Sequence, residues 1–554
     1  VQIDTTAIIK DGKHIGTAAI ARFDFNTKKG EQIIVSTAIS GVSMQGAERN
    51  LSAEVPDNDF DKYRNAIRDN WNRQLSKIKV ESSNNDDKVN FYTALYHSMI
   101  APTIYSDVDG AYYGPDKQIH QTNGWVNYST FSLWDTFRAA HPLFTYTEPE
   151  RANDMIKGFL KFYEQNGALP LWNLYGWETN MMIGYHAVPV IVDAYLKGIG
   201  NFDPEKALEA CIATANRDDY RGIGDYKKLG YVPAYGDPKK WENWSLSKTL
   251  EYAYDDYCIA QAAKKLGKED DYHYFLNRAL SYQTLIDPET KYMRGRDSKG
   301  DWRTPFTPVA YRGPGSVHGW GDITEGFTMQ YTWYVPQDVQ GYINEAGKEL
   351  FRKRNGQSTY VWNAADEVVV GDKSPDAQGS FGIYWHGNEP CHHVAYLYNY
   401  LKEPWKCQKW IRTIVDRFYG NTPDALSGND DCGQMSAWYL FNCIGFYPVA
   451  PSSNIYNIGS PCAEAITVRM SNGKNIEMTA DNWSPKNLYV KELYVNGKKY
   501  DKSYLTYDDI RDGVKLRFVM SGKPNYKRAV SDEAVPPSIS LPEKTMKYKS
   551  SIGF

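Results

Sequence analysis

The sequence lacks a surplus of positive charge and a long apolar run. Its 554 residues hold 63 lysines and arginines against 67 aspartates and glutamates, a formal net charge of −4. Proteins that bind nucleic acid through counterion release carry a basic field instead. No run of about eighteen apolar residues occurs in the chain, so no membrane-spanning segment is predicted. We therefore expect neither a nucleic-acid partner nor a transmembrane segment.

Cysteine is also scarce and unpaired in its spacing. The seven cysteines form no CxxC motif and no zinc-like spacing with the ten histidines. An odd count argues against a full disulfide framework, so free buried thiols are predicted. Aromatic residues, by contrast, make up 14% of the chain, with 43 Tyr and 16 Trp. Such side chains serve either to stack on sugar rings or to fill a core, and composition alone leaves both interpretations open.

The hydrophobic pattern divides the chain into strands, then helices, then strands. An early Lys-Asp-Gly turn signal and the β-branched stretch 31–40 indicate strands near the start, and Asn496-Gly497 indicates a hairpin near the end. The predicted parts are an N-terminal β-region (1–58), a helical linker (59–88), a helical domain (89–451) and a β-rich region packing on it (452–554). The predicted fold class is thus multidomain α+β.

Two kinds of helix alternate in the central region. The stretch AVPVIVDAYL is apolar on most sides, whereas PEKALEACIATANRD is amphipathic. An inner ring of buried helices inside an outer ring of half-exposed ones gives this mixture, which favours an (α/α)6 toroid. The strands before residue 59 are too few for a stand-alone sheet. They fit either a fragment of a longer chain or a domain completed by a segment outside this sequence.

Polar residues gather in loops that precede apolar helices, where a toroid opens at one end. These loops contain YSTFSLWDTF with Trp134 and Asp135, LPLWNLYGWETN with Trp177 and Glu178, TEGFTMQY with Glu325 and Gln330, YWHGNEPCHH with His386, Asn388 and Glu389, and SGNDDCGQ with Asp430 and Asp431. Acids beside aromatics and amides are what a glycosidase needs, because a carboxyl must protonate the leaving oxygen and a carboxylate must activate water or attack the anomeric carbon. We expect Trp134, Trp177, Glu178 and His386 to bind the sugar.

Simpler structural roles compete with these assignments. Asp135 is equally consistent with a helix N-cap, and dipole complementation accounts for one of Asp430 and Asp431 but hardly for both. Glu325 also opens a helical stretch, where an acid has a structural role. Trp320 and other aromatic residues nearby in the sequence favour a raised pKa for Glu325, because they would desolvate its carboxyl group. A Cys–His hydrolase built on Cys432 is the weakest alternative, because the neighbouring carboxylates oppose a thiolate.

Four long stretches carry a resemblance to a known family: SLWDTF, EGFTMQYTWYVPQD, HGNEPCHH and GNDDCGQMSAWYLFNCIGFYPVAPSSNIY. In order and spacing they resemble glycoside hydrolase family 92, the calcium-dependent exo-acting α-mannosidases of glycan-degrading bacteria. The resemblance implies that residues 1–58 are the C-terminal portion of an N-terminal β-sandwich domain and that residues 89–451 are an (α/α)6 catalytic domain. It implies hydrolysis with inversion, with Glu325 as general acid and Asp431 or Asp430 as general base. It also implies Ca²⁺ bound by Gln330, Asn388 and Glu389, and Asp135 holding hydroxyls of the terminal mannose.

The resemblance also implies mannose-containing glycans as substrate and an exported, periplasmic or cell-surface location in a glycan-degrading bacterium. It further implies that an N-terminal segment of the same protein precedes Val1. Two alternatives stay open: another inverting (α/α)6 glycosidase or disaccharide phosphorylase, and a glycan-binding protein without catalysis. The presence of both Glu325 and the Asp430–Asp431 pair argues against the second, since binding alone does not need an acid and a base.

Overall fold

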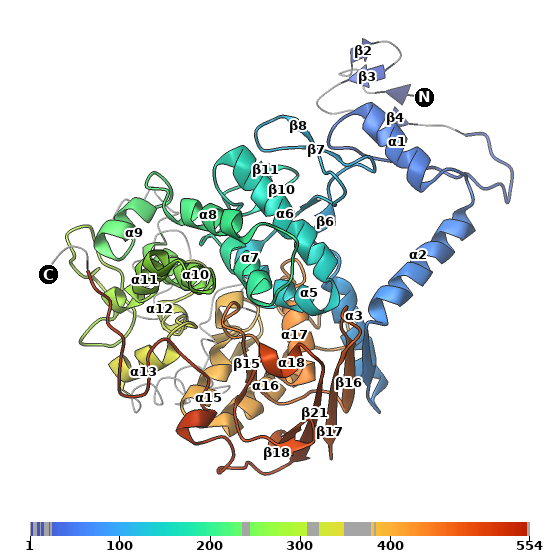
Figure 1. The fold of residues 1–554 in the computed structure, drawn as a ribbon. Helices are drawn as coiled ribbons and strands as arrows, with labels where there is room; N and C mark the ends of the chain where they lie inside the picture. The colour runs from blue at the N-terminus through green and yellow to red at the C-terminus, as the bar shows by residue number, and fades with distance from the viewer. Residues whose placement is uncertain are drawn as a thin grey trace.

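The computed structural model describes residues 25–234, 244–306, 321–347, 378–381 and 384–550 in full, and four short strands before residue 25 by their backbone. Most helices lie on one side of the molecule, and the C-terminal strands form a β-rich region on the other (Figure 1). Among the described residues, none of the helices has the length and apolar character needed to cross a membrane.

The N-terminal region matches the predicted strands only in part. Strands β2 (Ile8–Lys10) and β3 (Lys13–Ile15) pair antiparallel around the predicted turn, and β1 (Gln2–Ile3) pairs with β4 (Ala21–Arg22). The stretch 31–40, expected to be a strand, forms none. Residues 44–54, also expected among strands, form helix α1 (Met44–Glu54), capped by the Ser43 side chain, which accepts the N–H of Gly46. These two expectations were wrong because β-branched composition alone does not provide a pairing partner.

The helices of the central region follow the predicted pattern. They are α2 (Phe60–Leu75), α3 (Asn85–His97), α4 (Leu133–Thr136), α5 (Ala140–Thr147), α6 (Pro149–Asn166), α7 (Ala187–Leu196), α8 (Pro204–Ala215), α9 (Ile223–Leu229), α10 (Ser245–Lys265), α11 (Glu269–Arg278), α12 (Thr328–Tyr331), α13 (Val339–Ala346), α15 (Leu397–Tyr400), α16 (Pro404–Phe418) and α17 (Gln434–Ile444). Proline at the first position and glycine after the last explain the clean ends of α6. Helices α7 and α10 are buried along most of their length, whereas α8 and α11 keep an exposed face. This is the expected mixture of inner and outer helices, while closure into a six-fold toroid stays a prediction.

Short strand pairs connect these helices on the side that holds the polar loops. They are β6 (Thr103–Ile104) with β9 (Tyr128–Ser129), β7 (Ala111–Tyr113) with β8 (Ile119–Gln121), β10 (Asn173–Leu174) with β11 (Trp177–Glu178), and β12 (Ser380–Phe381) with β13 (Tyr384–Trp385). Each pair is antiparallel, so each returns the chain close to where it left the helical body.

A six-stranded sheet dominates the C-terminal region, in the order β19-β18-β21-β17-β16-β5. Its members are β16 (Ala465–Arg469), β17 (Asn475–Asp481), β18 (Tyr489–Val495), β19 (Lys498–Lys499), β21 (Val514–Ser521) and, from the predicted linker, β5 (Ile78–Glu81). Strand β5 pairs antiparallel with β16, with Ile466 opposite Val80, and lies beside the last strands in Figure 1. A smaller sheet joins β14 (Phe446–Tyr447), β15 (Ile455–Ile458) and β20 (Tyr504–Thr506), followed by α18 (Tyr507–Ile510). The C-terminal strands were predicted, but the part played by β5 was not.

Candidate active site

Three acids from distant parts of the chain meet in one cluster. Asp135 lies in α4, Glu389 begins the 3-10 helix Glu389–Cys391, and Asp431 lies in the loop before α17. One carboxylate oxygen of each lies within 4.8 Å of the others. All three belong to stretches singled out in the sequence, so the structure brings together the core of the predicted site.

Two of the three acids, Asp135 and Glu389, are buried and short of hydrogen-bond donors among the described residues. Asp135 is 3% exposed and Glu389 is 1% exposed. Both carboxylate oxygens of Glu389, and Oδ1 of Asp135, have no hydrogen-bond partner within the described part of the chain. Burial and then the neighbouring Asp431 raise the pKa of both carboxyl groups well above their ordinary values. Buried carboxylates without donors favour either protons or a cation between them.

A short relay of hydrogen bonds fixes the other oxygen of Asp135. The Ser132 hydroxyl donates to Asp135 Oδ2, and the Trp172 indole Nε1 donates to that hydroxyl at 2.9 Å. Trp172 is in turn placed by Glu178, whose Oε1 accepts its backbone N–H at 3.1 Å. The carboxylate thus keeps one oxygen held and the other directed into the cluster.

The loop carrying Asp430 and Asp431 ends in a turn of positive φ. Asp431 has φ 44° and Cys432 φ 56°, and Gly433 at φ 87° begins α17. Asp430 Oδ1 accepts the backbone N–H of Ser436 at 2.9 Å, which anchors the loop to the first turn of the helix. Burial raises the pKa of Asp430 to about 6, although the hydrogen bonds from Ser436 oppose the shift. Only one of the two acids therefore caps the helix, and Asp431 turns to the cluster.

Glu325 is joined to the cluster through its backbone. The Asn388 side chain donates from Nδ2 to the Glu325 carbonyl oxygen at 2.6 Å, and Asn388 Oδ1 accepts the N–H of Glu389 at 3.1 Å. Gln330, in α12, accepts the N–H of Phe327 at 2.7 Å through its Oε1. Glu325 is half-buried at φ 44°, and the neighbouring Phe327 is fully buried, whereas Trp320 lies outside the described residues.

Two residues expected to bind substrate have buried side chains with protein partners. The Trp134 indole Nε1 donates to Glu251 Oε1 at 2.9 Å, and the ring is 2% exposed. The His386 ring, 0% exposed, bonds the Tyr384 hydroxyl at 3.0 Å and the Tyr419 hydroxyl at 2.7 Å. Their roles in binding a sugar stay predictions.

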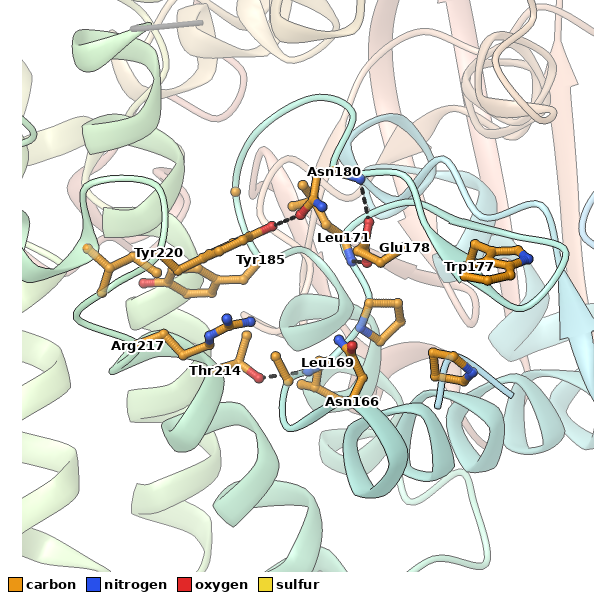
Figure 2. A pocket seen from close by; sticks show the side chains of 15 residues that line it. Asn166, Leu169, Leu171, Trp177, Glu178, Asn180, Tyr185, Thr214, Arg217 and Tyr220 are labelled. Carbon is orange, nitrogen blue, oxygen red and sulfur yellow. Dashed lines mark hydrogen bonds between the residues drawn. The ribbon is translucent and has the colours of Figure 1, made fainter. Parts of the chain in front are cut away.

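Trp177 and Glu178 line a separate cavity of about 310 Å³ (Figure 2). Trp177 is 47% exposed at one side, and Tyr220 and Arg217 lie at the other. The Glu178 carboxylate accepts three backbone N–H groups, from Leu171, Trp172 and Asn180, at 2.7, 3.1 and 2.8 Å. Glu178 therefore shapes the loop, while Trp177 offers an aromatic face beside a polar hollow.

The cysteines behave as predicted where the structure tests them. All seven lie in described residues as free thiols, and six are buried. Burial raises the pKa of Cys432 to about 12, with the nearby Asp135 adding to the shift. The thiol stays protonated at neutral pH, so the Cys–His alternative has no support in this geometry.

The sequence analysis did not identify Ser132, Arg138 and Glu251. Ser132 bonds Asp135, and Arg138 and Glu251 contact the neighbouring Trp134. Glu251 and Asp255 stand four positions apart in a helix whose residues are otherwise largely buried. This spacing places two acids on one helix face, which was the available signal.

The arrangement can hold a cation and transfer protons. Glu389 supplies two buried oxygens that lack donors among the described residues, and the Gln330 and Asn388 side-chain oxygens each accept one backbone N–H. Helix α12 packs against the 3-10 helix that begins at Glu389. Oxygen ligands of this kind suit a hard divalent ion. Asp430, which adjoins Asp431 in the chain, and Glu325, whose carbonyl oxygen bonds Asn388, are candidates for proton transfer.

Comparison with known proteins gives concordant matches. The chain is 69% identical to a solved family GH92 α-mannosidase of Bacteroides thetaiotaomicron, determined in complex with mannoimidazole, with a TM-score of 0.87 over 93% of this chain and 66% of that one. A solved family GH92 inverting mannosidase of Bacteroides thetaiotaomicron VPI-5482 is 32% identical, with a TM-score of 0.80 over 90% of this chain and 68% of that one. A protein of Arthroderma benhamiae described as an uncharacterized secreted glycosidase is 25% identical over 95% of this chain and 65% of its own length.

The chain thus spans about two thirds of the length of these relatives. The model of the glycosyl hydrolase family 92 catalytic domain matches residues 46–522, a region that contains every member of the acidic cluster and both Glu325 and Asp430. The chain belongs to glycosyl hydrolase family 92.

Proposed function

We propose that this protein hydrolyses terminal α-linked mannose from mannose-containing glycans with inversion at the anomeric carbon. Family membership and the two mannosidase relatives support the substrate class. The observation that carries the proposal is the cluster of Asp135, Glu389 and Asp431, in which Asp135 Oδ1 and both Glu389 carboxylate oxygens are buried without a hydrogen-bond donor among the described residues. Such a cluster is unfavourable without a cation or substrate to satisfy it.

Glu325 is the proposed general acid, and Asp431 or Asp430 the general base. Inversion needs a carboxyl that protonates the leaving oxygen and a carboxylate that activates water on the opposite face of the sugar. A pKa of about 6 leaves Asp430 ionised at neutral pH yet still able to accept a proton. Asp431 is joined to the same loop and faces the cluster, so the two acids act on the water as a pair.

Gln330, Asn388 and Glu389 are the proposed ligands of Ca²⁺. When bound, the ion supplies a template for two vicinal hydroxyls of mannose and favours a flattened ring, closer to the oxocarbenium-like transition state. The fold of the chain shields Glu389 from solvent. It also holds the Asn388 side chain against the Glu325 carbonyl oxygen, so that the proposed general acid and a proposed metal ligand are linked. Asp135 then binds hydroxyls of the terminal mannose, in the orientation set by Ser132.

The cavity beside Trp177 is the proposed place for the part of the glycan beyond the cleaved bond. An exposed indole gives a sugar ring a stacking face, and Asn180, Arg217 and Tyr220 place polar atoms around it. An exported location is proposed as well, since it fits a glycan substrate and the relative described as secreted.

The decisive experiment follows the first sugar released from an α-mannoside by NMR. The β anomer is expected, whereas an α product would mean retention and contradict the assignment of acid and base. Glu325→Gln should lose far more activity on a poor leaving group than on an activated aryl mannoside, because only the former needs protonation. Equal losses on both substrates would remove Glu325 from the role of acid.

A further inference from the structure

The helix that carries Asp135 is too short to hold its own shape. Helix α4 spans only the four residues Leu133–Thr136, and no side chain caps its start. Forming a single helical turn costs the full entropy of nucleation, and so short a helix gains almost no further hydrogen bonds by propagation. Isolated helices of this length are therefore not stable. Contacts from elsewhere must therefore fix the direction of the Asp135 carboxylate.

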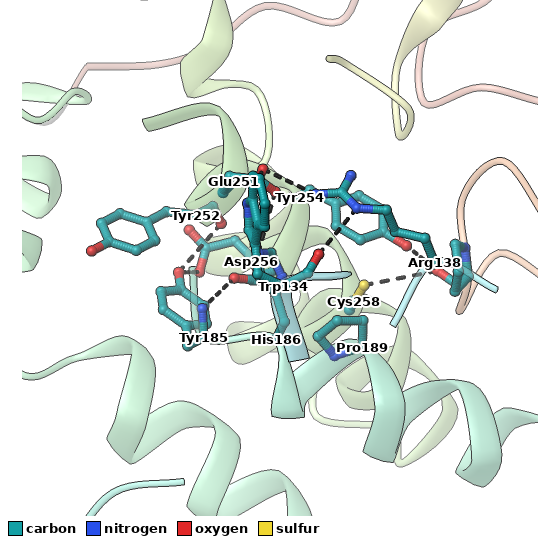
Figure 3. A network of polar contacts seen from close by, with 12 residues as sticks. Trp134, Arg138, Tyr185, His186, Pro189, Glu251, Tyr252, Tyr254, Asp256 and Cys258 are labelled. Atoms are coloured by element: carbon teal, nitrogen blue, oxygen red, sulfur yellow. Dashed lines mark hydrogen bonds and ion pairs between the residues drawn. The ribbon is translucent and has the colours of Figure 1, made fainter. Parts of the chain in front are cut away.

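A buried ion pair brackets the residue before Asp135. Glu251, in α10, is 0% exposed and accepts the Trp134 indole N–H through Oε1 at 2.9 Å. The same oxygen lies 3.3 Å from Arg138 Nη2, and Arg138 Nε donates to the Trp134 carbonyl oxygen at 3.0 Å. Trp134 is thus held by its side chain and by its backbone at once, as Figure 3 shows.

A second layer completes the bracket. His186 lies between Glu251 Oε2, at 3.3 Å, and Asp255 Oδ1, at 2.7 Å. Its ring stacks on Phe137, with centroids 4.4 Å apart and planes 16° from parallel. Although burial opposes it, Asp255 and Glu251 raise the pKa of His186 to about 9, so Arg138 and His186 supply two positive charges against two carboxylates. The charges are balanced inside an apolar core.

The network of Glu251, Arg138, His186 and Asp255 has a large desolvation cost for a contact that only packs the fold. Desolvating four charged groups commonly costs more than apolar side chains of similar size would. Three contacts of the network fall on Trp134 and Phe137, which flank Asp135, while Glu251 Oε1 also accepts the Tyr331 hydroxyl at 3.5 Å and Asp255 Oδ2 accepts the Tyr185 N–H at 2.8 Å. Polar shells of this kind around binding groups orient them, and losing one commonly costs 10–100-fold in activity or affinity.

We propose that Glu251 and Arg138, supported by His186, are positioning residues that aim the Asp135 carboxylate into the acidic cluster through helix α4. The inference rests on the proposed function only for what Asp135 does there. The geometry of α4 itself is independent of the reaction.

A double-mutant cycle separates positioning from general stability. Glu251→Gln keeps the size of the side chain and removes its charge, and should lower kcat/KM for an α-mannoside about 10–100-fold. In an Asp135→Asn background the same change should cost less than about threefold further, because the carboxylate that it aims is already gone. Losses that multiply in the double variant would overturn the proposal.

Asp256→Asn is the matched control on the same helix. Asp256 is also 0% exposed and bonds Arg278 at 2.8 Å and the hydroxyls of Tyr185 and Tyr226 at 2.7 and 2.8 Å. None of these contacts is with α4 or with Arg138, so the control should lower the unfolding temperature while kcat/KM stays within about threefold of the parent. An activity loss in Asp256→Asn equal to that in Glu251→Gln would mean that any buried charge in α10 matters, which contradicts positioning.

Amide hydrogen exchange tests the inference without any activity. In Glu251→Gln, the amides of residues 132–138 should exchange at least about tenfold faster than in Asp256→Asn, since the uncharged side chain no longer forms the ion pair with Arg138, whose Nε holds the Trp134 carbonyl oxygen. Unchanged exchange there would overturn the proposal even if catalysis falls. If Glu251→Gln does not fold, Trp134→Phe removes the hydrogen bond between the indole and Glu251 and is judged by the same two measurements. Absence of mannosidase activity in the parent would count against the proposed function alone, because the exchange result would still stand.

Discussion

Two acids of the site occupy backbone conformations that L-residues seldom adopt. Glu325 and Asp431 both have φ 44°, in the left-handed region. Asn and Asp tolerate this region better than most residues, because their short side chains bond locally, whereas Glu does not share that advantage. Strained positions that persist in a packed structure gather at functional sites. The backbone thus supports the roles assigned to these residues independently of their charge.

Asp431→Asn should abolish hydrolysis and yet raise stability when cations are removed. Asparagine keeps the left-handed backbone, while loss of the charge relieves the repulsion that raises the pKa of Asp135 and of Glu389. The expected gain is about 1 kcal/mol in unfolding free energy, measured by denaturant titration in EDTA. Asp424→Asn, an exposed acid in the same loop, serves as control and should change neither quantity. A less stable but active Asp431→Asn protein would contradict both parts.

His141 links the core to pH. Burial lowers its pKa to about 3 from 6.5, and its Nε2 has no hydrogen-bond partner among described residues. Below pH 6.5, His141 therefore takes up a proton in the unfolded chain but not in the folded chain. The contribution of neutral His141 to the free energy of unfolding is present above pH 6.5 and is lost as pH falls toward 3. Between pH 7 and pH 5 the loss is about 2 kcal/mol.

His141→Leu should remove that part of the pH dependence. Unfolding free energies at pH 7 and pH 5 are compared for parent and variant, and the parent should lose about 2 kcal/mol more than the variant does. The same replacement at His273, whose side chain is 71% exposed, should leave the difference unchanged. Equal losses in the parent and in His141→Leu would show that His141 titrates normally in the fold.

At the scale of elements, the start of α17 depends on one glycine. A Cβ on Gly433, at φ 87°, would lie 2.6 Å from the Ser98 Cα, which is backbone and cannot give way easily. The close approach lets the loop of Asp430 and Asp431 pack against the end of α3, since α17 and α3 are in contact. The position of the proposed base is therefore tied to that of a helix far away in sequence.

Gly433→Ala should destabilise the protein by about 3 kcal/mol, from the unfavourable φ together with the overlap. Gly473→Ala separates the two causes, because Gly473 has φ 77° but a Cβ there meets nothing within 4 Å. The control should cost about 1 kcal/mol, measured as the same shift in chemical unfolding, and should keep full activity. Similar costs at both positions would mean that the contact with Ser98 is unimportant.

Some helices and strands could be predicted from local sequence pattern and others could not. Helices such as α6 could be placed from sequence, because proline, glycine and apolar spacing all act within the segment. Strand β5 could not, because its partner β16 lies at the other end of the chain and four residues between two helices give no pairing signal. Helix α1 was missed for a related reason, since the β-branched residues before it outweighed the capping Ser43.

At the scale of the whole molecule, the acids of the site were predictable and their surroundings were not. Long motifs identified Asp135, Glu389 and Asp431, and the fold brings them together. No motif could indicate that the Trp134 indole turns to Glu251, or that the Glu178 carboxylate is used by three backbone N–H groups. Side-chain direction depends on tertiary contacts, so residue type in a loop predicts chemistry better than it predicts which way a group points.

The same cluster should couple the stability of the entire chain to calcium. Glu389, one of the proposed Ca²⁺ ligands, lies beside Asp135 and Asp431, so a Ca²⁺ bound to it would offset the repulsion among the three acids and raise the stability of the folded chain. At a hundredfold excess over Kd the gain is about 2.7 kcal/mol, seen as a rise in Tm after EDTA-treated protein receives calcium. Glu389→Gln should abolish the rise, whereas Asp256→Asn, buried but outside the cluster, should keep it. The rise should also shrink as pH falls toward 5, because the raised pKa values of Asp135 and Glu389 let protons compete for the same oxygens. A Tm indifferent to calcium at neutral pH would leave the cluster without its proposed ion and would return its acids to a role in binding sugar alone.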